Sequence, residues 1–263
     1  MPDHTPCAWK SVLGLVAIGL LVGAWVAERG ERGPARARLR AALLAATAFV
    51  ALAAFTNLGR FHDIARWPGF AHYWEHFHYQ LGSRFFAELG YDGLYAASVV
   101  AQREISPNVP PEPRIRDLAD YGWISTTTDA PALAAVRARF APERWQAFVR
   151  DHVEYQKVLG TGTMAAIRSD HGYNPTPWWT FVARAFTRFL DSTPAGLSAL
   201  ALLDVASLAV AFAVVARTFG AWTACAALAV FGTGYGWRFY YNGGALLRFD
   251  WLAAALVGVC ALE

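Results

Sequence analysis

Residues 41–58 read AALLAATAFVALAAFTNL and carry no charged side chain. Together with its neighbours, this run approaches the roughly 20 residues that an α-helix needs to cross a hydrocarbon core about 30 Å thick. A similar run, SVLGLVAIGLLVGAWV, precedes it at residues 11–26, and further apolar runs follow at 194–215 and 221–235. We therefore expect an all-α protein, built as a polytopic bundle of transmembrane helices.

The composition agrees with a membrane protein. Hydrophobic residues make up 56% of the 263 residues and charged residues 16%, and the mean hydropathy is +0.26, which is too apolar for an ordinary soluble domain. The first run has few positive charges before it and no cleavage-site pattern after it, so we favour a retained helix over a signal peptide. A fifth apolar run begins near Trp251 and continues to Glu263. Because a helix that ends inside lipid leaves carbonyl groups unpaired, we expect a longer protein.

An arginine-rich loop between the first two runs predicts the orientation of the chain. Residues 28–40 read ERGERGPARARLR, and short loops rich in arginine stay in the cytoplasm. If the first run crosses the membrane, the chain starts outside the cytosol; if that run only lies at the surface, it starts inside. In both cases residues 59–193 are extracytoplasmic. We therefore divide the chain into two transmembrane helices at 1–58, a large helical extracytoplasmic loop at 59–193 and further transmembrane helices at 194–263.

Cysteine content and net charge exclude other classes of protein. Cys7, Cys225 and Cys260 are widely spaced, so they indicate neither a disulfide framework nor a metal knuckle. The formal net charge of +3 is modest, and its arginines gather near one membrane surface. Nucleic acid is therefore not an expected partner.

The start of the outer loop is predicted to be helical. Residues 71–89 contain no proline and read as one amphipathic helix, which Gly90 ends. The spacing predicts a shared face carrying Glu75, Tyr79, Gly82 and Phe86. A turn at residues 91–93 then leads into a second helix over 94–102.

The rest of the loop alternates breaks with helices. Residues 106–113, SPNVPPEP, should form an extended connector. Asp129 is a candidate cap for a helix through residue 140, and Pro142 suits the first turn of another that runs to about residue 159. Glycines at 160 and 162 break that helix, and a short one is expected over 164–169. The rings of DHGYNPTPWW, residues 170–179, would anchor the return to the membrane.

A cluster of ionisable side chains and rings follows the second apolar run. Residues 61–79 read FHDIARWPGFAHYWEHFHY. Glu75 or Asp63 could act as a general base that takes a proton from an acceptor hydroxyl, while arginines hold a phosphate leaving group. Alternatively, His72, His76 and His78 could bind a divalent metal together with one of these carboxylates. The metalloprotease signature His-Glu-x-x-His is absent, and each histidine taken alone is more often packed than ligating.

Two further acidic residues have more than one interpretation. Asp204 lies in the middle of the apolar run 194–215, where an ionisable group must face protein or water. It is either a buried, hydrogen-bonded structural residue or part of a headgroup or proton path, and Arg248 is its expected partner. Arg248 and Arg238 lie on the outer side, where they either flank a helix or bind an anionic group. Asp92 suits a turn.

The order of these features resembles a known family. An apolar run, then residues 74–79, WEHFHY, then a helix closing in residues 90–95, GYDGLY, looks like the first outer loop of polytopic C-type glycosyltransferases. It is most similar to the bacterial branch related to polyprenyl-phosphate-mannose-dependent mannosyltransferases. Residues 173–179, YNPTPWW, are similar to the Tyr-Pro-Pro-aromatic stretch that leads into a later span. The chain departs from the family in having Glu for the commoner Asp at Glu75, and in the long stretch between the two matches.

The resemblance implies a membrane glycosyltransferase in the bacterial inner membrane. It would move a sugar from a polyprenyl-phosphate donor to a glycan, lipid or protein acceptor on the extracytoplasmic side, with inversion at the anomeric carbon. The family's acid falls on Glu75, with Asp63 as the competitor. The residues expected to bind substrate are His76, His78, Tyr79, Arg84, Asp92, Tyr173, Asn174 and Arg248. No cofactor is assigned with certainty, and a divalent metal is possible. The alternatives are a metal-dependent membrane hydrolase and a non-catalytic membrane subunit with a binding loop.

Overall fold

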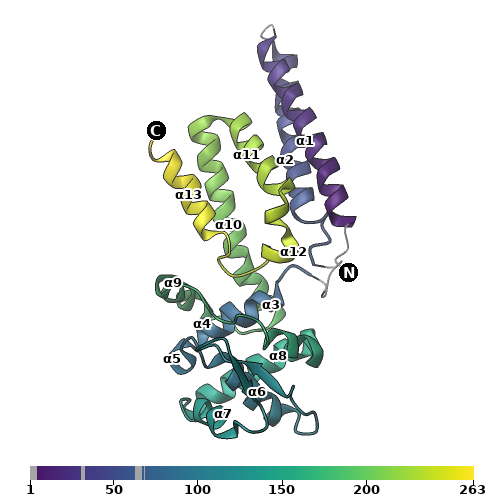
Figure 1. Cartoon of the computed structure of the whole chain (residues 1–263). Coiled ribbons are helices and arrows are strands. Elements are labelled where there is room, and N and C mark those ends of the chain that lie inside the picture. The colour runs from purple at the N-terminus through teal and green to yellow at the C-terminus, as the bar shows by residue number, and fades with distance from the viewer. Residues whose placement is uncertain (1–4, 31–32, 63–66, 68) are drawn as a thin grey trace. The chain divides into compact units, whose positions relative to one another are not determined.

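A computed structural model describes residues 5–30, 33–62, 67 and 69–263, and it divides the chain into two compact units (Figure 1). One unit, here called the apolar unit, comprises Met1–Phe70 and Leu202–Glu263. The other, the loop unit, comprises Ala71–Ala201. The predicted ring-rich stretch at the start of the outer loop is therefore shared between them, since residues up to Phe70 belong to the apolar unit.

The long helices agree with the apolar runs of the sequence. Three helices are long and apolar enough to cross a membrane, namely α1 (Thr5–Arg29), α2 (Pro34–Phe55) and α10 (Pro194–Phe219). Two others, α11 (Ala221–Thr233) and α13 (Asp250–Cys260), are apolar but shorter. The chain is thus a mostly helical protein with three candidate membrane spans.

Helices α1, α2 and α11 pack side by side (Figure 1). Gly232 of α11 lies directly against α2, where a Cβ atom would come within 2.2 Å of the carbonyl oxygen of Ala51. Lys10 of α1 is only 2% exposed, and its Nζ donates a hydrogen bond to the carbonyl oxygen of Gly232 at 3.0 Å. A cation at this place satisfies a carbonyl that the end of a helix leaves without a helical partner.

Aromatic rings fill the end of the apolar unit where α2 stops and α11 meets the following turns, η2 (Tyr235–Trp237) and α12 (Phe239–Asn242). The ring of Phe55 contacts those of Phe231 at 4.8 Å and Phe239 at 5.3 Å between centroids. His62 is 1% exposed, and its ring lies 4.9 Å from that of Phe239. Burial lowers the pKa of His62 to about 4.

Asp204 is a structural residue of the apolar unit. Its carboxylate accepts hydrogen bonds from the backbone N–H groups of Arg248 at 2.9 Å and Phe249 at 3.0 Å. These two residues directly precede α13, so the carboxylate caps the start of that helix. The hydrogen-bonded interpretation is thus confirmed, with Arg248 contributing its backbone amide to the contact.

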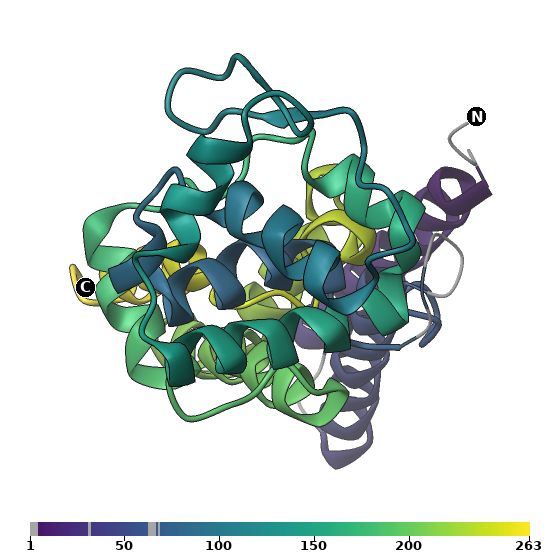
Figure 2. The same ribbon diagram turned by 90° about the horizontal axis from the view of Figure 1, so that it is seen from below.

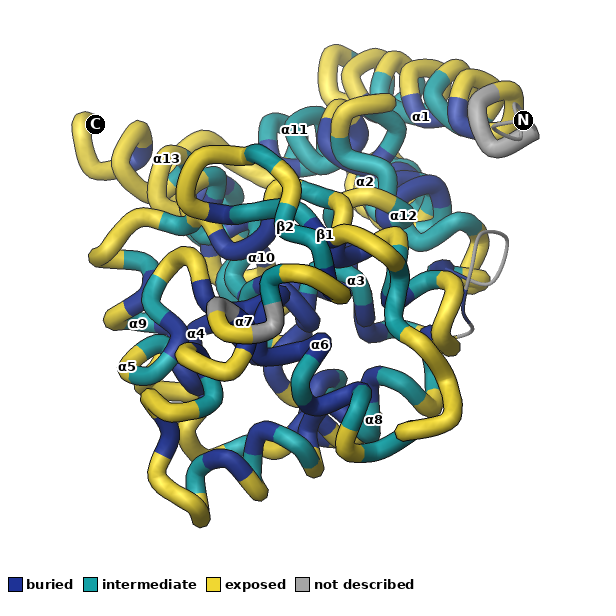
Figure 3. Tube along the Cα trace, turned by 60° about the horizontal axis from the view of Figure 1, so that its bottom comes forward, coloured by how far each residue is buried: buried dark blue, intermediate teal, exposed yellow. Residues whose placement is uncertain are grey.

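The loop unit is a set of short helices around a buried centre. Figure 2 looks onto the chain from below, with the first helices of the unit in the middle and α8 beside them. The elements are α3 (Tyr73–His76), the π-helix η1 (Phe77–Leu81), α4 (Gly82–Arg84), α5 (Phe86–Leu89), α6 (Leu94–Ile105), β1 (Arg114–Arg116), β2 (Trp123–Ser125), α7 (Ala130–Arg137), α8 (Pro142–Ile167) and α9 (Pro177–Thr187). Helix α6 is buried over most of its length (Figure 3).

The predicted helices are present, but several details differ. Asp129 occupies the N-cap position of α7, but its carboxylate accepts from the backbone N–H of Ser125 and does not cap the helix. The single helix expected over 71–89 is interrupted by η1 and again at Phe85, although it ends as predicted at Gly90, whose φ is +58°. The helix that begins at Pro142 is broken at Gly160, whose φ of +68° and ψ of 168° are not helical, so its predicted end near residue 159 is confirmed, although a second helical segment follows directly and reaches Ile167. The antiparallel hairpin of β1 and β2 was not expected. It is held partly by Arg116, whose guanidinium lies 4.1 Å from the ring centroid of Trp123.

Candidate functional site

The two segments that carry the family resemblance lie against each other in the loop unit. The indole N–H of Trp74 donates to Asp170 Oδ2 at 2.9 Å, and the Tyr79 hydroxyl donates to Asn174 Oδ1 at 2.9 Å. The ring of Tyr79 also meets that of Trp179 edge-on, 5.4 Å away. A helix near the start of the loop is thus joined to the segment that leads toward α10, nearly 100 residues later in the chain.

We call the resulting group the aromatic surface. Its members are Trp74, Glu75, Tyr79, Asp170, Asn174 and Trp179. Asn174 is exposed and the others are half-buried, with one carboxylate oxygen of Glu75 inaccessible. Glu75 is assigned to this surface from the spacing in the sequence, four residues before Tyr79. The surface combines rings, a carboxylate pair and an amide, which are the groups that orient a polar ligand.

Tyr173 supports this surface from behind. It is 3% exposed, and its hydroxyl donates to Thr180 Oγ1 at 2.7 Å. Its ring lies so close to Gly82 that a Cβ atom there would be 2.4 Å away, and it also contacts the rings of Tyr79 and Phe86. Tyr79, Gly82 and Phe86 therefore share a face, as the helical spacing predicts. Tyr173, expected to bind substrate, is placed where it positions Tyr79, and burial raises its pKa.

Helix α3, which carries Glu75, is followed directly by the π-helix η1, whose turns are wider than those of an α-helix. Segments of this kind are rare and are frequently found at functional sites. The side chains of η1 that turn inward are nearly inaccessible, among them His78 and Gln80, at 3% and 0% exposure. Gln80 is fixed by two donors to its Oε1, the hydroxyl of Tyr155 at 2.8 Å and that of Ser192 at 2.9 Å. No feature of the sequence signalled this network.

The histidines of the cluster are packed in the protein interior. The imidazole of His78 shares a hydrogen bond with the Tyr95 hydroxyl at 2.8 Å. Burial lowers the pKa of His78 to about 4, although the neighbouring Asp170 carboxylate acts in the opposite direction. His76 is 0% exposed, and His72 caps α3 by accepting the backbone N–H of Glu75 at 3.3 Å. These places agree with a packing role for each.

Within the residues that the structure describes, no group of three or more His, Cys, Asp and Glu side chains is placed to hold a metal ion. Asp63, the second candidate base and the second candidate ligand carboxylate, lies outside the described residues. The described part of the histidine cluster therefore does not by itself favour the hydrolase.

Arg84 is held by carboxylates of its own unit. Its Nε lies 3.3 Å from Asp151 Oδ2, one terminal nitrogen lies 2.8 Å from Asp191 Oδ1, and the other donates to the carbonyl oxygen of Leu190. It lines a cavity of about 290 Å³ together with Asp151, Asp191 and Glu154. Burial raises the pKa of Asp151, and the guanidinium of Arg84 opposes that rise. Because its two ionic partners are Asp151 of α8 and Asp191 before α10, Arg84 links α4 to both of these segments.

A second buried network, which sequence analysis missed, centres on Arg168. This side chain is completely buried and donates to both carboxylate oxygens of Glu112, to Gln102 Oε1 and to Ser98 Oγ. Ser98 Oγ in turn shares a hydrogen bond with His152 Nε2 at 2.8 Å. The network fastens the proline-rich connector onto α6 and α8. Its members are separated by up to 70 residues, so no local pattern announces it.

Two of the remaining predicted binding residues lie elsewhere. Asp92 is exposed in the turn after Gly90, 3.4 Å from Arg139 Nη1, as expected for turn chemistry. Arg248 belongs to the apolar unit, where its Nε donates to Asn242 Oδ1 at 3.4 Å. Anion binding by Arg248 stays a prediction.

Helix α9 has one face of small residues and one of exposed rings. Thr180, Ala183 and Thr187 are buried, and Thr187 Oγ1 lies 3.2 Å from Ser83 Oγ. On the other side, Trp178 is 72% and Phe181 69% exposed, and their rings stack 5.7 Å apart. Rings so exposed just before an apolar helix are typical of a membrane interface.

No protein-family model, curated protein or solved structure matches this chain.

Proposed function

We propose that this protein is a membrane glycosyltransferase that moves a sugar from a polyprenyl-phosphate donor to an acceptor hydroxyl, with Glu75 as the general base. The observation that supports the proposal best is the aromatic surface. The two segments that together resemble the glycosyltransferase family, residues 74–79 and 173–179, contact each other through the Tyr79–Asn174 hydrogen bond and the Tyr79–Trp179 ring contact. The resemblance is drawn from the sequence alone and does not require these segments to touch. Their contact in the structure is therefore a separate argument for the proposal.

The groups of the surface match the proposed chemistry. The acceptor oxygen would attack the anomeric carbon, the bond from that carbon to the phosphate oxygen would break, and the lipid phosphate would leave. Glu75 would take the proton of the acceptor hydroxyl, a role that requires a carboxylate within hydrogen-bond reach. Trp74 and Trp179 offer flat apolar faces, and Asn174 offers an amide for a sugar hydroxyl.

The helix geometry supports the choice of Glu75. Its neighbours on the inner side, His78 and Gln80, are locked by hydrogen bonds to Tyr95, Tyr155 and Ser192. A general base works best when the element that carries it is fixed in advance, because no free energy is then lost in ordering it during the reaction.

The test is sugar transfer from a polyprenyl-phosphate-linked hexose by the full-length protein in proteoliposomes. Glu75→Gln should lower kcat by about 10²- to 10⁴-fold, the range for loss of a general base, while leaving expression unchanged. Glu154→Gln is the matched control, because Glu154 pairs with Lys157 on α8, apart from the aromatic surface. Full activity in both Glu75→Gln and Asp63→Asn would refute the proposed base. A stable partner and no turnover with any lipid-linked sugar would instead favour the binding subunit.

A further inference from the structure

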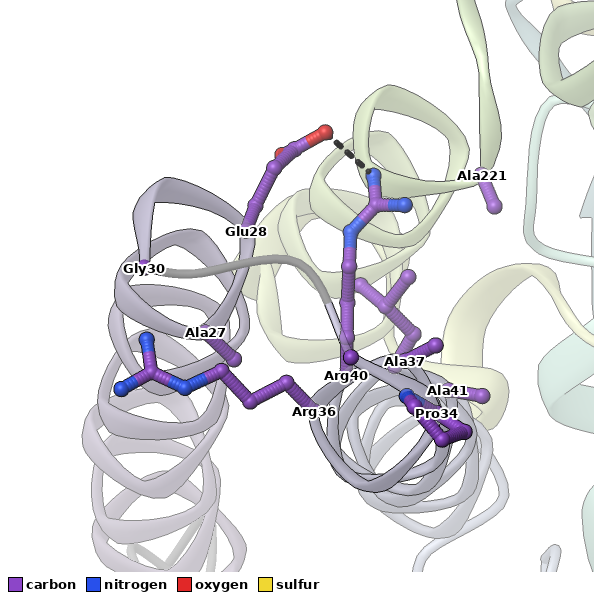
Figure 4. Close-up of a pocket in the computed structure, with 11 residues that line it drawn as sticks. Ala27, Glu28, Gly30, Pro34, Arg36, Ala37, Arg40, Ala41 and Ala221 are labelled. Atoms are coloured by element: carbon purple, nitrogen blue, oxygen red, sulfur yellow. Dashed lines mark ion pairs between the residues drawn. The ribbon is translucent and has the colours of Figure 1, made fainter.

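The apolar unit contains a second site at the arginine-rich end of its helices. A cavity of about 710 Å³ lies among the end of α1, the start of α2 and the first residue of α11 (Figure 4). It is the end of these helices at which the sequence places the short loop rich in arginine. Nothing in the proposed transfer reaction uses it.

Two arginines of α2 supply its charge. In Figure 4, Arg40 extends toward Glu28 of α1, and Arg36 extends toward Gly30. A Cβ atom on Gly30 would come within 1.0 Å of Arg36 Nη1, so the guanidinium of Arg36 lies directly against the backbone of Gly30. With two guanidinium groups and one carboxylate, the described residues that line the cavity carry a net positive charge.

The carboxylate of Glu28 does not prevent an anion from binding to Arg40. Arg40 Nη2 and Glu28 Oε1 are 3.0 Å apart, but the two side chains are 35% and 50% exposed. Exposed ion pairs of this kind contribute about 0–1 kcal/mol, so an anion with two or more oxygens can compete with Glu28 for the arginine. Arg36 has no ion pair among those the structure shows within its described residues, and in Figure 4 its guanidinium lies against α1 near Gly30, apart from that of Arg40.

The floor of the cavity is apolar and made of small residues. Ala37, Ala41 and Leu44 of α2 line it, with Ala27 opposite on α1 and Ala221 at the start of α11. Both α1 and α2 are candidate spans, so this floor continues into the part of the helices that would face hydrocarbon. A small soluble anion would gain nothing from such a floor, whereas an acyl chain would bury apolar surface against it.

We propose that this cavity binds the headgroup of an anionic phospholipid, with its phosphate on Arg40, with Arg36 adding positive charge on the side of α1, and with the upper part of an acyl chain on the alanine-lined floor. Basic pockets between transmembrane helices on the cytoplasmic side are known to bind anionic headgroups. Arginine suits the role, because its planar guanidinium meets phosphate oxygens in pairs. The site does not depend on the proposed sugar transfer.

The test is native mass spectrometry of the purified protein after exchange into micelles that contain phosphatidylglycerol or phosphatidylcholine. We expect retained phosphatidylglycerol and little phosphatidylcholine. The double variant Arg36→Gln/Arg40→Gln should lower the affinity for phosphatidylglycerol by about 10- to 100-fold, as two interfacial arginines contribute. Arg38→Gln is the matched control, since Arg38 is exposed on the same helix and does not line the cavity.

A second variant separates a lipid from a free anion. Ala41→Leu keeps every charge and fills the floor, so it should also lower phosphatidylglycerol retention. Circular dichroism of each variant should show unchanged helix content. Equal retention by wild type and the double variant, or an equal loss in Arg38→Gln, would overturn the proposal. Displacement of phosphatidylglycerol by millimolar inorganic phosphate, with no effect of Ala41→Leu, would overturn the lipid assignment in favour of a free anion.

Discussion

Two buried histidines should make the loop unit lose stability as the pH falls below about 6.5. His152 is 0% exposed, and burial together with the positive charge of Arg168 lowers its pKa to about 3. His78 is 3% exposed, and burial lowers its pKa to about 4. Both are therefore neutral in the folded protein at pH 5. In the unfolded chain both have the ordinary value of about 6.5 and bind a proton at that pH.

The size of the loss follows from the difference in protons bound. A group with a depressed folded-state pKa favours the unfolded state at every pH below its unfolded value, until the folded-state value is reached. Between pH 7 and pH 5, each histidine therefore costs about 2 kcal/mol, or about 1.4 kcal/mol for each of the 1.5 pH units below 6.5. The sum, about 4 kcal/mol, is a large part of a typical unfolding free energy of 5–15 kcal/mol.

The measurement must report on the loop unit alone, because His62 of the apolar unit is also buried with a lowered pKa. Hydrogen exchange of peptides from α6 and α8 at pH 7 and pH 5 meets this need, once the intrinsic pH dependence of exchange is removed. The two histidines lower the opening free energy of these peptides by about 4 kcal/mol, and Asp151, whose pKa is raised by burial, offsets part of this because it binds its proton more readily in the folded chain. His152→Gln keeps a hydrogen-bonding group toward Ser98 and should remove about half of the loss due to the histidines.

An opening free energy that stays constant between pH 7 and pH 5 would refute the reasoning. So would a His152→Gln variant with the same pH dependence as the wild type.

Three further predictions concern packing, capping and the membrane interface. Gly82→Ala should destabilise the protein by about 1–3 kcal/mol in thermal unfolding, because the added methyl group would clash with Tyr173, whereas Gly162→Ala meets no atom within 4 Å and should not destabilise it. Asp204→Leu should cost about 2–6 kcal/mol, since it leaves two backbone N–H groups unsatisfied where α13 starts, and Asp204→Asn should restore part of the loss. Spin labels placed at Phe181 should show contact with lipid in a bilayer; labels there that are fully accessible to water would contradict an interfacial α9.

The parts of the fold that could be predicted are those set by local chemistry. Gly90 ends a helix because its φ of +58° suits glycine, and Pro142 opens one because its fixed φ fits the first turn. The face formed by Tyr79, Gly82 and Phe86 follows from helical spacing alone. The apolar runs likewise gave the three candidate spans, since length and hydropathy are enough to recognise them.

The parts that could not be predicted depend on contacts across long separations. Arg168 looked like one of many surface arginines, yet it is completely buried, because Ser98, Gln102 and Glu112 all converge on it. Arg84 has the residue type expected of a phosphate ligand, but Asp151 and Asp191 occupy its guanidinium. In both cases, residue type indicates what a side chain can bind, while the fold decides whether that capacity is already used inside the protein.

The helix that carries the aromatic surface also has side chains that are already bonded inside the protein and others that are not. On the inner side of the helix, His78 and Gln80 have their polar groups satisfied by neighbours in the core, so they fix the helix and leave no bonding capacity for a ligand. On the other side, Glu75 and Tyr79 remain half-buried, and Tyr79 contacts the segment that leads toward α10. A buried polar network of this kind is costly unless every member is satisfied, but once satisfied it holds the helix in one position. A carboxylate on such a helix keeps its direction while a ligand enters, as a general base must.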